Sequence, residues 1–537
     1  KHKISREPVV ATLILTNCLI PLSLPSSPFR QQGTRSTLSL DNHSSSPGPA
    51  PETSRKRPFP CARGHPPAPG TRHPGHLFAA EHPGAHMKSH SPISRLLRRA
   101  ASRPHAARGI SRPSPSPLPT FPAATCLQQK PRVPSSLLFP RHLCSPPSPS
   151  TITACTMTTD DERSLQESVE VFAREVLAPR VRQMDDNAAM DPDIVSACFE
   201  QGLMAIEAPE EYGGVGLGFT AACLAVEEVA RVDPSVAVMI DIQNTLLITS
   251  FMRYGTPEQK ERFLTRLCTD TVCSFCLTEA GSGSDAFALK TRATWDEGSG
   301  EWVIEGTKCW ISNSNEAGLF VVFANADFSK GHKGITAFIV ERSCPGLSVG
   351  PKEAKLGIRA SSTCEVSFDG CRVPADHVLG EVGEGYKMAI ELLNEGRIGI
   401  GAQMVGLARG AFDAAMPYIH QRKQFGTPIA DFQGMQFQYA RAAMEVESAR
   451  VMVYNAARLK EAGRPFLREA AMAKLKATEV AQSVASQCID WVGGVGFTPA
   501  MPCEKMYRDS KIGTIYEGTS NIQLLTIAKS IQQQYRV

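Results

Sequence analysis

The feature that most constrains this 537-residue chain is an abrupt change in composition near residue 159. Residues 1–159 hold 27 of the 40 prolines and carry 20 Lys and Arg against 4 Asp and Glu. The net charge of +4 therefore divides into +16 before residue 160 and −12 after it. A segment of this kind buries too little apolar surface to offset the entropy lost on ordering. We predict that residues 1–158 are a disordered extension and that only the remainder folds.

Residues 87–158 have the composition of an organelle-targeting segment. They are rich in Arg and Ser, and no acidic residue occurs from position 82 to position 159. Within them, Ile93–Ala100 combines apolar and Arg side chains in a locally amphipathic pattern, which is typical of transit peptides. We therefore expect import into the mitochondrial matrix, with Met87 as the translation start and residues 1–86 as upstream sequence.

The sequence disfavours nucleic-acid binding, membrane insertion and metal binding. The basic residues of the extension are dispersed among Pro and Ser, so a nucleic-acid partner is the weaker interpretation of its charge. The apolar run at 13–24 is short and is broken by Pro21, so we expect no membrane span. The Cys-x-x-Cys pair Cys273 and Cys276 has no second pair or nearby His, which indicates buried structural thiols and no metal site.

We predict an α+β multidomain fold, with an all-α domain at 159–271, an antiparallel β-barrel or sandwich at 272–380, and a four-helix bundle at 381–537. Thr256 and Pro257 mark a helix start in the first domain, as cap and first helical residue. Apolar residues recur there at helical spacing: Leu165, Val169, Phe172 and Val176.

Strand and helix signals separate the other two domains. Short β-rich runs at Trp302–Gly306, Phe320–Phe323, Ile335–Val340 and Cys364–Phe368 are divided by turn residues such as Asp296–Gly300. One long helix follows Asp431 as its expected cap and ends before Gly463 and Pro465. Its apolar face consists of Phe432, Met435, Tyr439, Ala442, Val446 and Val453. The bundle lacks the Glu-x-x-His pairs of di-iron proteins.

The most informative chemical group is Glu517, which lies in the segment Ile515–Asn521. Gly518 lets backbone approach a bound molecule, and Thr519 or Ser520 can cap the helix that follows. The expected apolar face of that helix is Ile522, Leu525 and Ile527. A carboxylate held on such a loop in an apolar pocket has a raised pKa and can act as a general base. A solvated Glu favoured by the helix dipole is an equally good interpretation of this motif alone.

The segment Thr278–Asp285 is rich in glycine and hydroxyl groups. Its spacing Gly281-x-Gly283-x-x-Ala286 matches a dinucleotide-binding fingerprint, but strands rather than a helix follow it. We therefore favour a turn whose backbone N–H groups and hydroxyls bind a polar edge of a cofactor. A plain surface turn is the alternative.

Four other motifs have both a ligand-binding and a structural interpretation. Trp310–Ser312 offers an aromatic cover for a flat ring, or a core tryptophan. Asn394–Arg397 offers a cation for phosphate or carboxylate, or an ion pair between Glu395 and Arg397. The loop at 422–426 pairs a cation with an aromatic, which suits a nucleotide or an interface. The segment at 491–497 can simply be a glycine-rich helix C-terminus.

The order of these motifs is more specific than any one of them. The chain resembles the acyl-CoA dehydrogenase family over residues 160–537. The segments at 241–246, 360–364 and 463–467 are most similar to its mitochondrial short/branched-chain members. The resemblance implies one FAD per subunit, a homotetramer, an acyl-CoA substrate and electron-transferring flavoprotein as acceptor. The implied reaction is α,β-dehydrogenation of short and 2-methyl-branched acyl-CoA to 2-enoyl-CoA, in fatty-acid and isoleucine catabolism.

The resemblance also implies residue roles. Glu517 removes the α proton while the β hydrogen leaves as hydride to the flavin. Cofactor contacts within one subunit fall on Phe275, Cys276, Leu277, Thr278, Gly283, Ser284, Trp310, Ile311 and Ser312. Further cofactor contacts fall on Arg422, Phe425, Gln433, Asp490, Trp491, Val492, Gly493, Gly494, Thr519, Ser520 and Asn521, largely across a subunit interface. Substrate contacts fall on Ser284, His332, Tyr386, Asn394, Glu395, Gly396 and Arg397, and His332 stands where a close relative carries Tyr.

Three alternatives differ in class or substrate. A straight-chain, butyryl-type dehydrogenase would share every motif. An acyl-CoA oxidase usually carries a second C-terminal helical domain, for which the folded part of this chain is too short. A non-catalytic assembly protein of the same family would have no need of Glu517.

Overall fold

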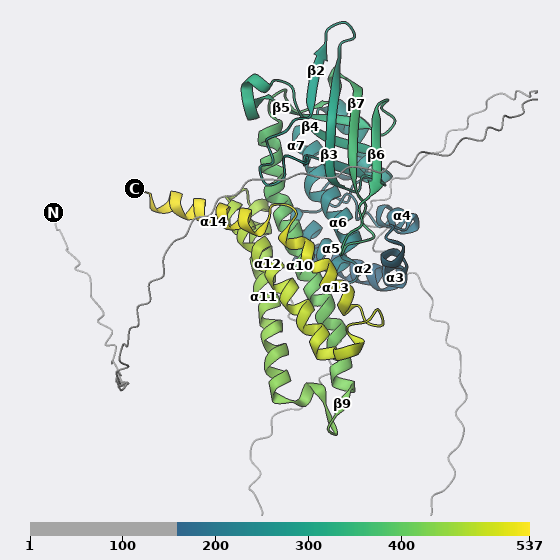
Figure 1. Cartoon of the computed structure of the whole chain (residues 1–537), viewed down its shortest axis with the longest axis vertical. Coiled ribbons are helices and arrows are strands. Elements are labelled where there is room, and N and C mark those ends of the chain that lie inside the picture. Colours follow the sequence, from purple (N-terminus) through teal and green to yellow (C-terminus); the bar gives the residue numbers. More distant parts are fainter. Residues whose placement is uncertain (1–157, 537) are drawn as a thin grey trace, which may run out of the picture. The chain divides into compact units, whose positions relative to one another are not determined.

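The computed structural model describes residues 158–536. Predictions for residues 1–157, including the transit segment and the start at Met87, lie outside this range. The described part consists of helices up to Thr269, strands from Cys273 to Leu379, and helices again from Gly385 (Figure 1). This order confirms the predicted fold class, whereas the exact domain boundaries stay predictions.

Two capping boxes begin helices of the first part. Thr159 Oγ1 accepts a bond from the N–H of Glu162 at 3.2 Å, and the N–H of Thr159 donates to Glu162 Oε2 at 2.8 Å. Thr256 and Gln259 repeat the arrangement, with Pro257 in the first turn as predicted. The elements are α2 (Asp160–Phe172), η1 (Ala173–Leu177), α3 (Ala178–Asn187), α4 (Pro192–Glu200), η2 (Glu210–Tyr212), α5 (Phe219–Ala230), α6 (Pro234–Asp241), η3 (Ile242–Ile248), α7 (Thr249–Tyr254), α8 (Pro257–Gln259), η4 (Lys260–Leu264) and α9 (Thr265–Thr269).

One predicted core position in this part is wrong. Val176 is 41% exposed, although Leu165, Val169 and Phe172 are buried as expected. The π-helical turn η1 begins directly after Phe172 and brings Leu177 into the core instead. Because a π turn bonds residues five apart, a pattern with the 3.6-residue period of an α-helix loses register there.

The helices α6, η3 and α7 run without a break from Pro234 to Tyr254. By length and composition this span, alone among the described residues, is apolar enough to cross a membrane. However, 94% of its most apolar window is buried inside the protein, where α6 and η3 pack against α10 (Gly385–Gln421). Its apolar character is therefore that of a core helix.

The middle part is one mixed sheet of β1 (Cys273–Cys276), β2 (Arg292–Asp296), β3 (Glu301–Ser312), β4 (Leu319–Asn325), β5 (Ile335–Glu341), β6 (Leu347–Lys352), β7 (Thr363–Pro374) and β8 (Val378–Leu379). The strand order is β6-β7-β3-β2-β4-β5-β8, with β1 paired to β4. The β1–β4 and β2–β4 pairs are parallel and the others antiparallel. Every residue of β4 is buried, because one face packs on the helices and the other on a separate cluster within the sheet.

The last part is a helical bundle of α10, α11 (Gln433–Glu461) and α12 (Leu467–Val492), with α13 (Cys503–Ser510) and α14 (Ser520–Tyr535). A small hairpin, β9 (Lys423–Gln424) and β10 (Thr427–Pro428), joins α10 to α11 at the end of the bundle far from the sheet (Figure 1). Asp431 does not cap α11, which is a correction: the N-cap residue is Phe432, and no side chain bonds the first turn. Asp431 instead lies in the short turn η7 (Ile429–Asp431).

The described residues include eleven cysteines, and all are free thiols. Nine of them are buried, and Cys309 and Cys344 are half-buried. Cys273 and Cys276 lie in β1 with both side chains buried, as predicted. Burial raises the pKa of the Cys276 thiol to about 12, so this pair has the protonation state of structural thiols.

Candidate active site

Glu517 lies on the connection between the short turn η9 (Lys511–Thr514) and α14. Its φ is +50°, a left-handed conformation that is uncommon for a residue with a side chain, and Gly518 follows at +86°. Thr519 caps α14 by accepting a bond from the N–H of Ile522. The expected apolar face of α14 is wrong in part, because Leu525 is 48% exposed and Gln523 is the buried residue.

Gln523 is buried because its amide reaches back to the Glu517 loop. Its Nε2 donates to the carbonyl oxygens of Glu517 at 3.0 Å and of Gly518 at 2.9 Å. From α12, the ammonium of Lys474 donates to the carbonyl oxygens of Gly513, Tyr516 and Gly518 at 2.6, 2.9 and 2.8 Å. The left-handed backbone at Glu517 is therefore fixed from two helices, and neither contact was foreseen from the sequence.

The carboxyl group of Glu517 lies in a site that favours its neutral form. Its Oε2 atom is buried and has no hydrogen-bond partner among the described residues. Burial raises the pKa of Glu517 to about 7, while the positive charges of Lys474 and Arg397 act in the opposite direction. A carboxylate with a pKa near neutrality has the properties required of a general base.

Helix α10 leaves room for this carboxyl group. A Cβ atom added at Gly396 would overlap Glu517 Oε2, and one added at Gly399 would overlap the carboxyl of Asp241. The two glycines are three residues apart, so they lie on one face of the helix. Only glycine at these positions allows two carboxyl groups to lie directly against α10.

Asp241, at the end of α6, is a second buried acid near Glu517 that the sequence did not suggest. Its Oδ1 accepts a bond from Thr245 at 3.2 Å, and its buried Oδ2 lacks a partner within residues 158–536. Burial, and then the charge of Glu517, raise the pKa of Asp241 well above its ordinary value. The two buried carboxyl groups therefore titrate as an interacting pair.

The segment Asn394–Arg397 lies on α10 beside Glu517. Arg397 donates to Asn394 Oδ1 at 2.8 Å, and its Nε atom has no partner in the described part of the chain. Glu395 forms its ion pairs with Arg253 and with Lys460, so the alternative of a Glu395–Arg397 pair is wrong. Arg397 therefore keeps an unused donor close to the base.

The two predicted cofactor segments of the sheet lie together. The N–H of Cys309 donates to the carbonyl of Thr278 at 3.0 Å, and Ser274 Oγ donates to the carbonyl of Ser312 at 2.9 Å. The buried Lys308 links them further, since its ammonium bonds the carbonyl of Leu277 at 3.1 Å and Glu279 Oε1 at 2.8 Å. Phe275–Thr278 and Trp310–Ser312 thus form one surface.

Trp310 lies within β3, is 61% exposed and has a φ of +59°. It is therefore not a core tryptophan. The register of β3 against β7 shifts between Lys308 and Ile311, so a β-bulge turns the indole outwards. A Cβ at Gly281 or Gly283 would meet no atom within 4 Å. An exposed indole beside an open turn of hydroxyls and N–H groups fits the flat ring and polar edge of a flavin.

The second set of predicted cofactor residues lies elsewhere in the same chain. Arg422, Phe425 and Gln433 are exposed around the β9–β10 hairpin, and Phe425 is 98% exposed with a φ of +53°. Figure 1 places this hairpin at the opposite end of the bundle from the sheet. One chain therefore does not bring the two sets together.

At the end of α12 the predicted side chains differ in accessibility. Trp491 and Val492 are buried, and Trp491 donates to Gln438 at 3.0 Å. Asp490, Gly493 and Gly494 are exposed, with Gly493 left-handed at φ +74° as the C-cap residue. The backbone of the glycines, rather than the indole, is the surface that this segment offers. Ser520 and Asn521 lie in the first turn of α14.

Two predicted substrate residues, His332 and Tyr386, lie at another junction. The centroids of the His332 and Tyr386 rings are 4.5 Å apart, and those of the Phe287 and Tyr386 rings are 4.2 Å apart. His332 comes from η5 (Phe328–Gly334), Tyr386 begins α10, and Phe287 follows Ser284 on the exposed turn. The sequence-distant segments at 284–287, 332 and 386 thus form one aromatic surface.

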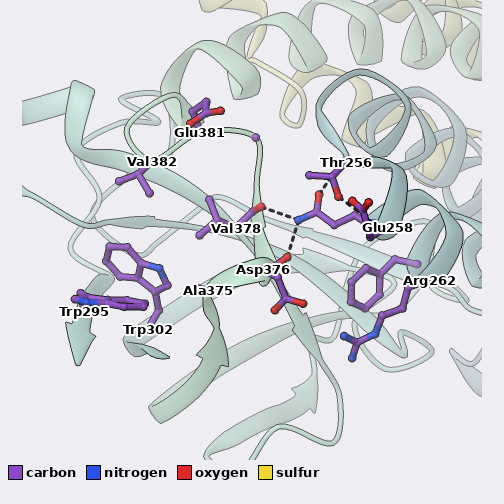
Figure 2. A pocket seen from close by; sticks show the side chains of 13 residues that line it. Thr256, Glu258, Arg262, Trp295, Trp302, Ala375, Asp376, Val378, Glu381 and Val382 are labelled. Carbon is purple, nitrogen blue, oxygen red and sulfur yellow. Dashed lines mark hydrogen bonds between the residues drawn. The ribbon is translucent and has the colours of Figure 1, made fainter. Parts of the chain in front are cut away.

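A separate pocket of about 770 Å³ lies between the first helical part and the sheet (Figure 2). Gln259 crosses it and donates to the carbonyls of Asp376 and Val378 at 2.7 and 2.8 Å. Trp295 and Trp302 form one wall. None of the predicted site residues lines this pocket, so it is distinct from the candidate active site.

Backbone strain also marks the candidate site. In the part of the chain that the structure describes, six non-glycine residues have a positive φ: Ala188, Trp310, Asn313, Ile358, Phe425 and Glu517. Three of the six are residues predicted to bind cofactor or to act as the base. Strained backbone persists only where the surroundings over-determine it, and it concentrates at functional sites.

Comparison with known proteins identifies the family of this chain. Family profiles described as the N-terminal, middle and C-terminal domains of acyl-CoA dehydrogenase match residues 159–271, 274–371 and 383–532. The mitochondrial short/branched chain specific acyl-CoA dehydrogenase of Bos taurus is 54% identical over 377 residues, which is 70% of this chain and 87% of that protein. The mitochondrial short-chain specific acyl-CoA dehydrogenase of Mus musculus is 42% identical, covering 70% and 91%.

A solved structure is also similar. The glutaryl-CoA dehydrogenase from Mycobacterium smegmatis in complex with FADH2 superposes with a TM-score of 0.67 at 29% identity, covering 71% of this chain and 97% of that one. The three profiles together match most of residues 158–536. This chain therefore belongs to the acyl-CoA dehydrogenase family, whose members are flavoprotein oxidoreductases, and it is an enzyme of that class.

Proposed function

We propose that this protein dehydrogenates short and 2-methyl-branched acyl-CoA thioesters between Cα and Cβ to give 2-enoyl-CoA, with Glu517 as the general base. The observation that carries the proposal is the Glu517 carboxyl group itself. It is held on strained backbone, has a buried oxygen with no partner within residues 158–536, and has a pKa of about 7 because of burial. A solvated Glu at a helix N-terminus would have none of these three properties.

The base works by taking the proton α to the thioester carbonyl, and its surroundings set the conditions. Lys474 and Arg397 lower the pKa of Glu517 and so keep it ionised near neutral pH despite burial. The open glycine face of α10 at Gly396 gives the carboxylate room to lie beside the helix.

FAD, when bound, supplies the acceptor for the hydride that leaves Cβ. The hydroxyl-rich turn at 278–284 and the indole of Trp310 would hold it on one subunit. Arg422, Phe425 and Gln433 lie at the far end of the bundle, so they would have to come from a second copy of the chain. We therefore propose a homotetramer in which each cofactor is held between subunits.

The substrate, partner and compartment follow from similarity. The 54% identical relative is named for short and branched chains, against 42% for the one named for short chains alone. We propose electron-transferring flavoprotein as the electron acceptor and the mitochondrial matrix as the location. Initial rates with butyryl-CoA, 2-methylbutyryl-CoA and octanoyl-CoA test the substrate class. A preference for octanoyl-CoA would contradict it.

The role of Glu517 is tested by Glu517→Gln. The amide is nearly isosteric with the carboxyl group but cannot accept the α proton, so we expect kcat to fall about 10²–10⁴-fold. We expect the flavin content and circular dichroism of the variant to match the wild type, and its flavin absorbance to stay oxidised after 2-methylbutyryl-CoA is added. Near-normal bleaching of the flavin in a folded variant would exclude Glu517 as the base.

A further inference from the structure

The ammonium group of Lys474 is one of the most completely enclosed cations in the described residues. Its side chain is 1% exposed, and it lies on α12 among Ala470, Ala473 and Ala477, where an apolar residue would be expected. Burying a charged ammonium is costly unless every donor is satisfied. The buried Lys308 and Lys505 are paired with carboxylates, whereas the partners of Lys474 are carbonyl oxygens of the Glu517 loop.

The three donors of Lys474 match three carbonyl groups of that loop. Gly513 and Tyr516 precede Glu517 and Gly518 follows it, at donor–acceptor distances of 2.6, 2.9 and 2.8 Å. A protonated amine has three N–H donors and a neutral one has two. Only the charged form of Lys474 can therefore satisfy all three carbonyls at once.

We propose that Lys474 is a positioning residue for the base: its ammonium holds the backbone on both sides of Glu517, and so fixes the carboxylate in its reactive position while keeping it ionised. This inference rests on the proposed role of Glu517. It adds a residue that touches neither substrate nor cofactor in the scheme above.

The ionisation states of Lys474 and Glu517 depend on each other. Burial lowers the pKa of Lys474 to about 8, with the charge of Glu517 raising it and that of Arg397 lowering it further. Burial raises the pKa of Glu517 to about 7. The state with ionised Glu517 and protonated Lys474 thus predominates between about pH 7 and pH 8. Below that range the base is protonated, and above it the loop loses one of its three donors.

The other charged groups around this helix either face Lys474 or Glu517 or are paired with one another. From α10, Arg397 is the cation that faces both residues, and Asp241 faces Glu517 from α6. On the loop, the Tyr516 hydroxyl donates to Gln403. From α11, Glu445 pairs with Lys476, and from α13, Lys505 pairs with Asp233 and Asp509. The loop therefore depends on Lys474 for its positive charge on the α12 side.

The first test compares pH profiles of kcat for the holoenzyme and two variants. The wild type should lose activity above about pH 8, falling about tenfold by pH 9 as Lys474 deprotonates. Lys474→Arg keeps the positive charge at all accessible pH values. The pH at which kcat of this variant declines should therefore be higher than in the wild type by more than one pH unit. Lys474→Met should raise the pKa of Glu517. The pH at which kcat of this variant rises should therefore be higher than in the wild type by about one pH unit. Unmoved profiles in both variants would overturn the proposal.

Lys505→Met is the matched control, because Lys505 is also a buried lysine but is bonded to the carboxylates of Asp233 and Asp509 rather than to the loop carbonyls. Its loss should lower thermal stability without moving either limb of the pH profile. A shift of equal size in Lys505→Met would assign the effect to general destabilisation and overturn the specific role of Lys474.

The second test needs neither a variant nor turnover. Hydrogen–deuterium exchange of the peptide 511–519 in the wild-type holoenzyme is followed from pH 7 to pH 9, after correction for intrinsic exchange rates. Its protection should fall through about pH 8, while the buried strand β4 should keep its protection. Constant protection of 511–519 would overturn the proposal even if the Lys474 variants fail to fold. If protection of 511–519 falls near pH 8 but the protein does not oxidise acyl-CoA, the result would support the Lys474 contact and contradict the proposed function.

Discussion

The Glu517 carboxyl group is held where its neutral form is favoured, although its proposed reaction needs the ionised form. With a pKa of about 7, kcat/KM should rise from pH 6 to pH 8, with half of the plateau near pH 7 and about a tenth of it at pH 6. Initial rates with 2-methylbutyryl-CoA at constant ionic strength measure this. A half-rise near pH 4.5 would show that the ionising base is a solvated carboxylate.

The same pKa has a consequence for stability. Because the folded state holds the Glu517 proton up to about pH 7 and the unfolded chain releases it near pH 4.5, the unfolded state binds fewer protons between these values. Stability contributed by this group therefore falls as pH rises from 4.5 to 7. Glu517→Gln should raise Tm relative to wild type at pH 8 and have little effect at pH 4. Equal shifts at both pH values would contradict the burial of the charge.

Gly396 tests the position of the base. A Cβ at this residue would overlap the carboxylate of Glu517, so Gly396→Ala should displace the base while leaving its chemistry intact. Displacements of about 1 Å can cost about 10²-fold in rate, and we expect a loss of about 10–100-fold in kcat. Gly434→Ala is a control, because a Cβ there meets no atom within 4 Å. Equal rates in the two variants would contradict the close approach of Glu517 to α10.

At the scale of elements, the site is assembled where connections meet rather than along any one helix or strand. The aromatic surface of His332 and Tyr386 joins η5 to the start of α10 and lies against Phe287 of the exposed turn. We propose that this junction binds the CoA portion of the substrate. A contact of that kind acts equally in the ground state and in the transition state.

His332→Tyr should therefore change KM by several-fold and leave kcat nearly constant. Steady-state kinetics over a wide range of acyl-CoA concentrations separates the two constants. Phe328→Tyr, on the same short helix, is the matched control for an added hydroxyl on an exposed aromatic. A large change in kcat with constant KM would move His332 toward the reacting atoms.

The elements also show what sequence patterns can and cannot predict. The cap at Thr256, the end of α11 before Gly463 and the turn at 296–300 follow local rules, and the structure confirms them. The predicted burial of Val176 was wrong because a π turn shifts the helical register there. The predicted cap at Asp431 was wrong because this residue lies in a short 3-10 turn before the helix. Lys474 was missed because its partners are backbone carbonyls about 40 residues away, which leave no sequence signature. A lysine within an otherwise alanine-rich helix face was the one available signal.

At the scale of the whole molecule, the predicted cofactor site is divided between two ends of the chain. Phe425 and Phe497 are 98% and 80% exposed, which is unusual for large apolar side chains and indicates a surface that another molecule covers. The sequence motifs predict cofactor residues at both ends, and the proposed assembly would bring the two sets together. They could not show from one chain how the halves meet, since that depends on assembly.

Arg422→Ala tests the divided site. If a second copy supplies this cation to the cofactor, the variant should lose FAD on dialysis and shift to smaller assemblies together. Flavin absorbance per protomer and sedimentation velocity measure the two quantities on the same sample. Lys423→Ala, on the neighbouring exposed residue, is the matched control. Full flavin content with an unchanged assembly size in Arg422→Ala would contradict the role.

The reactivity of the free thiols can report local unfolding of this protein. Nine of the eleven described cysteines are buried, and burial raises the pKa of thiols such as Cys198 and Cys276 to about 12. Alkylating reagents react with the thiolate form. The buried thiols are therefore unreactive for two reasons: the reagent cannot reach them, and they stay protonated. Each transient opening of the fold releases a new set of reactive sulfur atoms. The number of alkyl groups added over time, read by intact mass, would therefore report which parts of this protein open first in an ageing preparation.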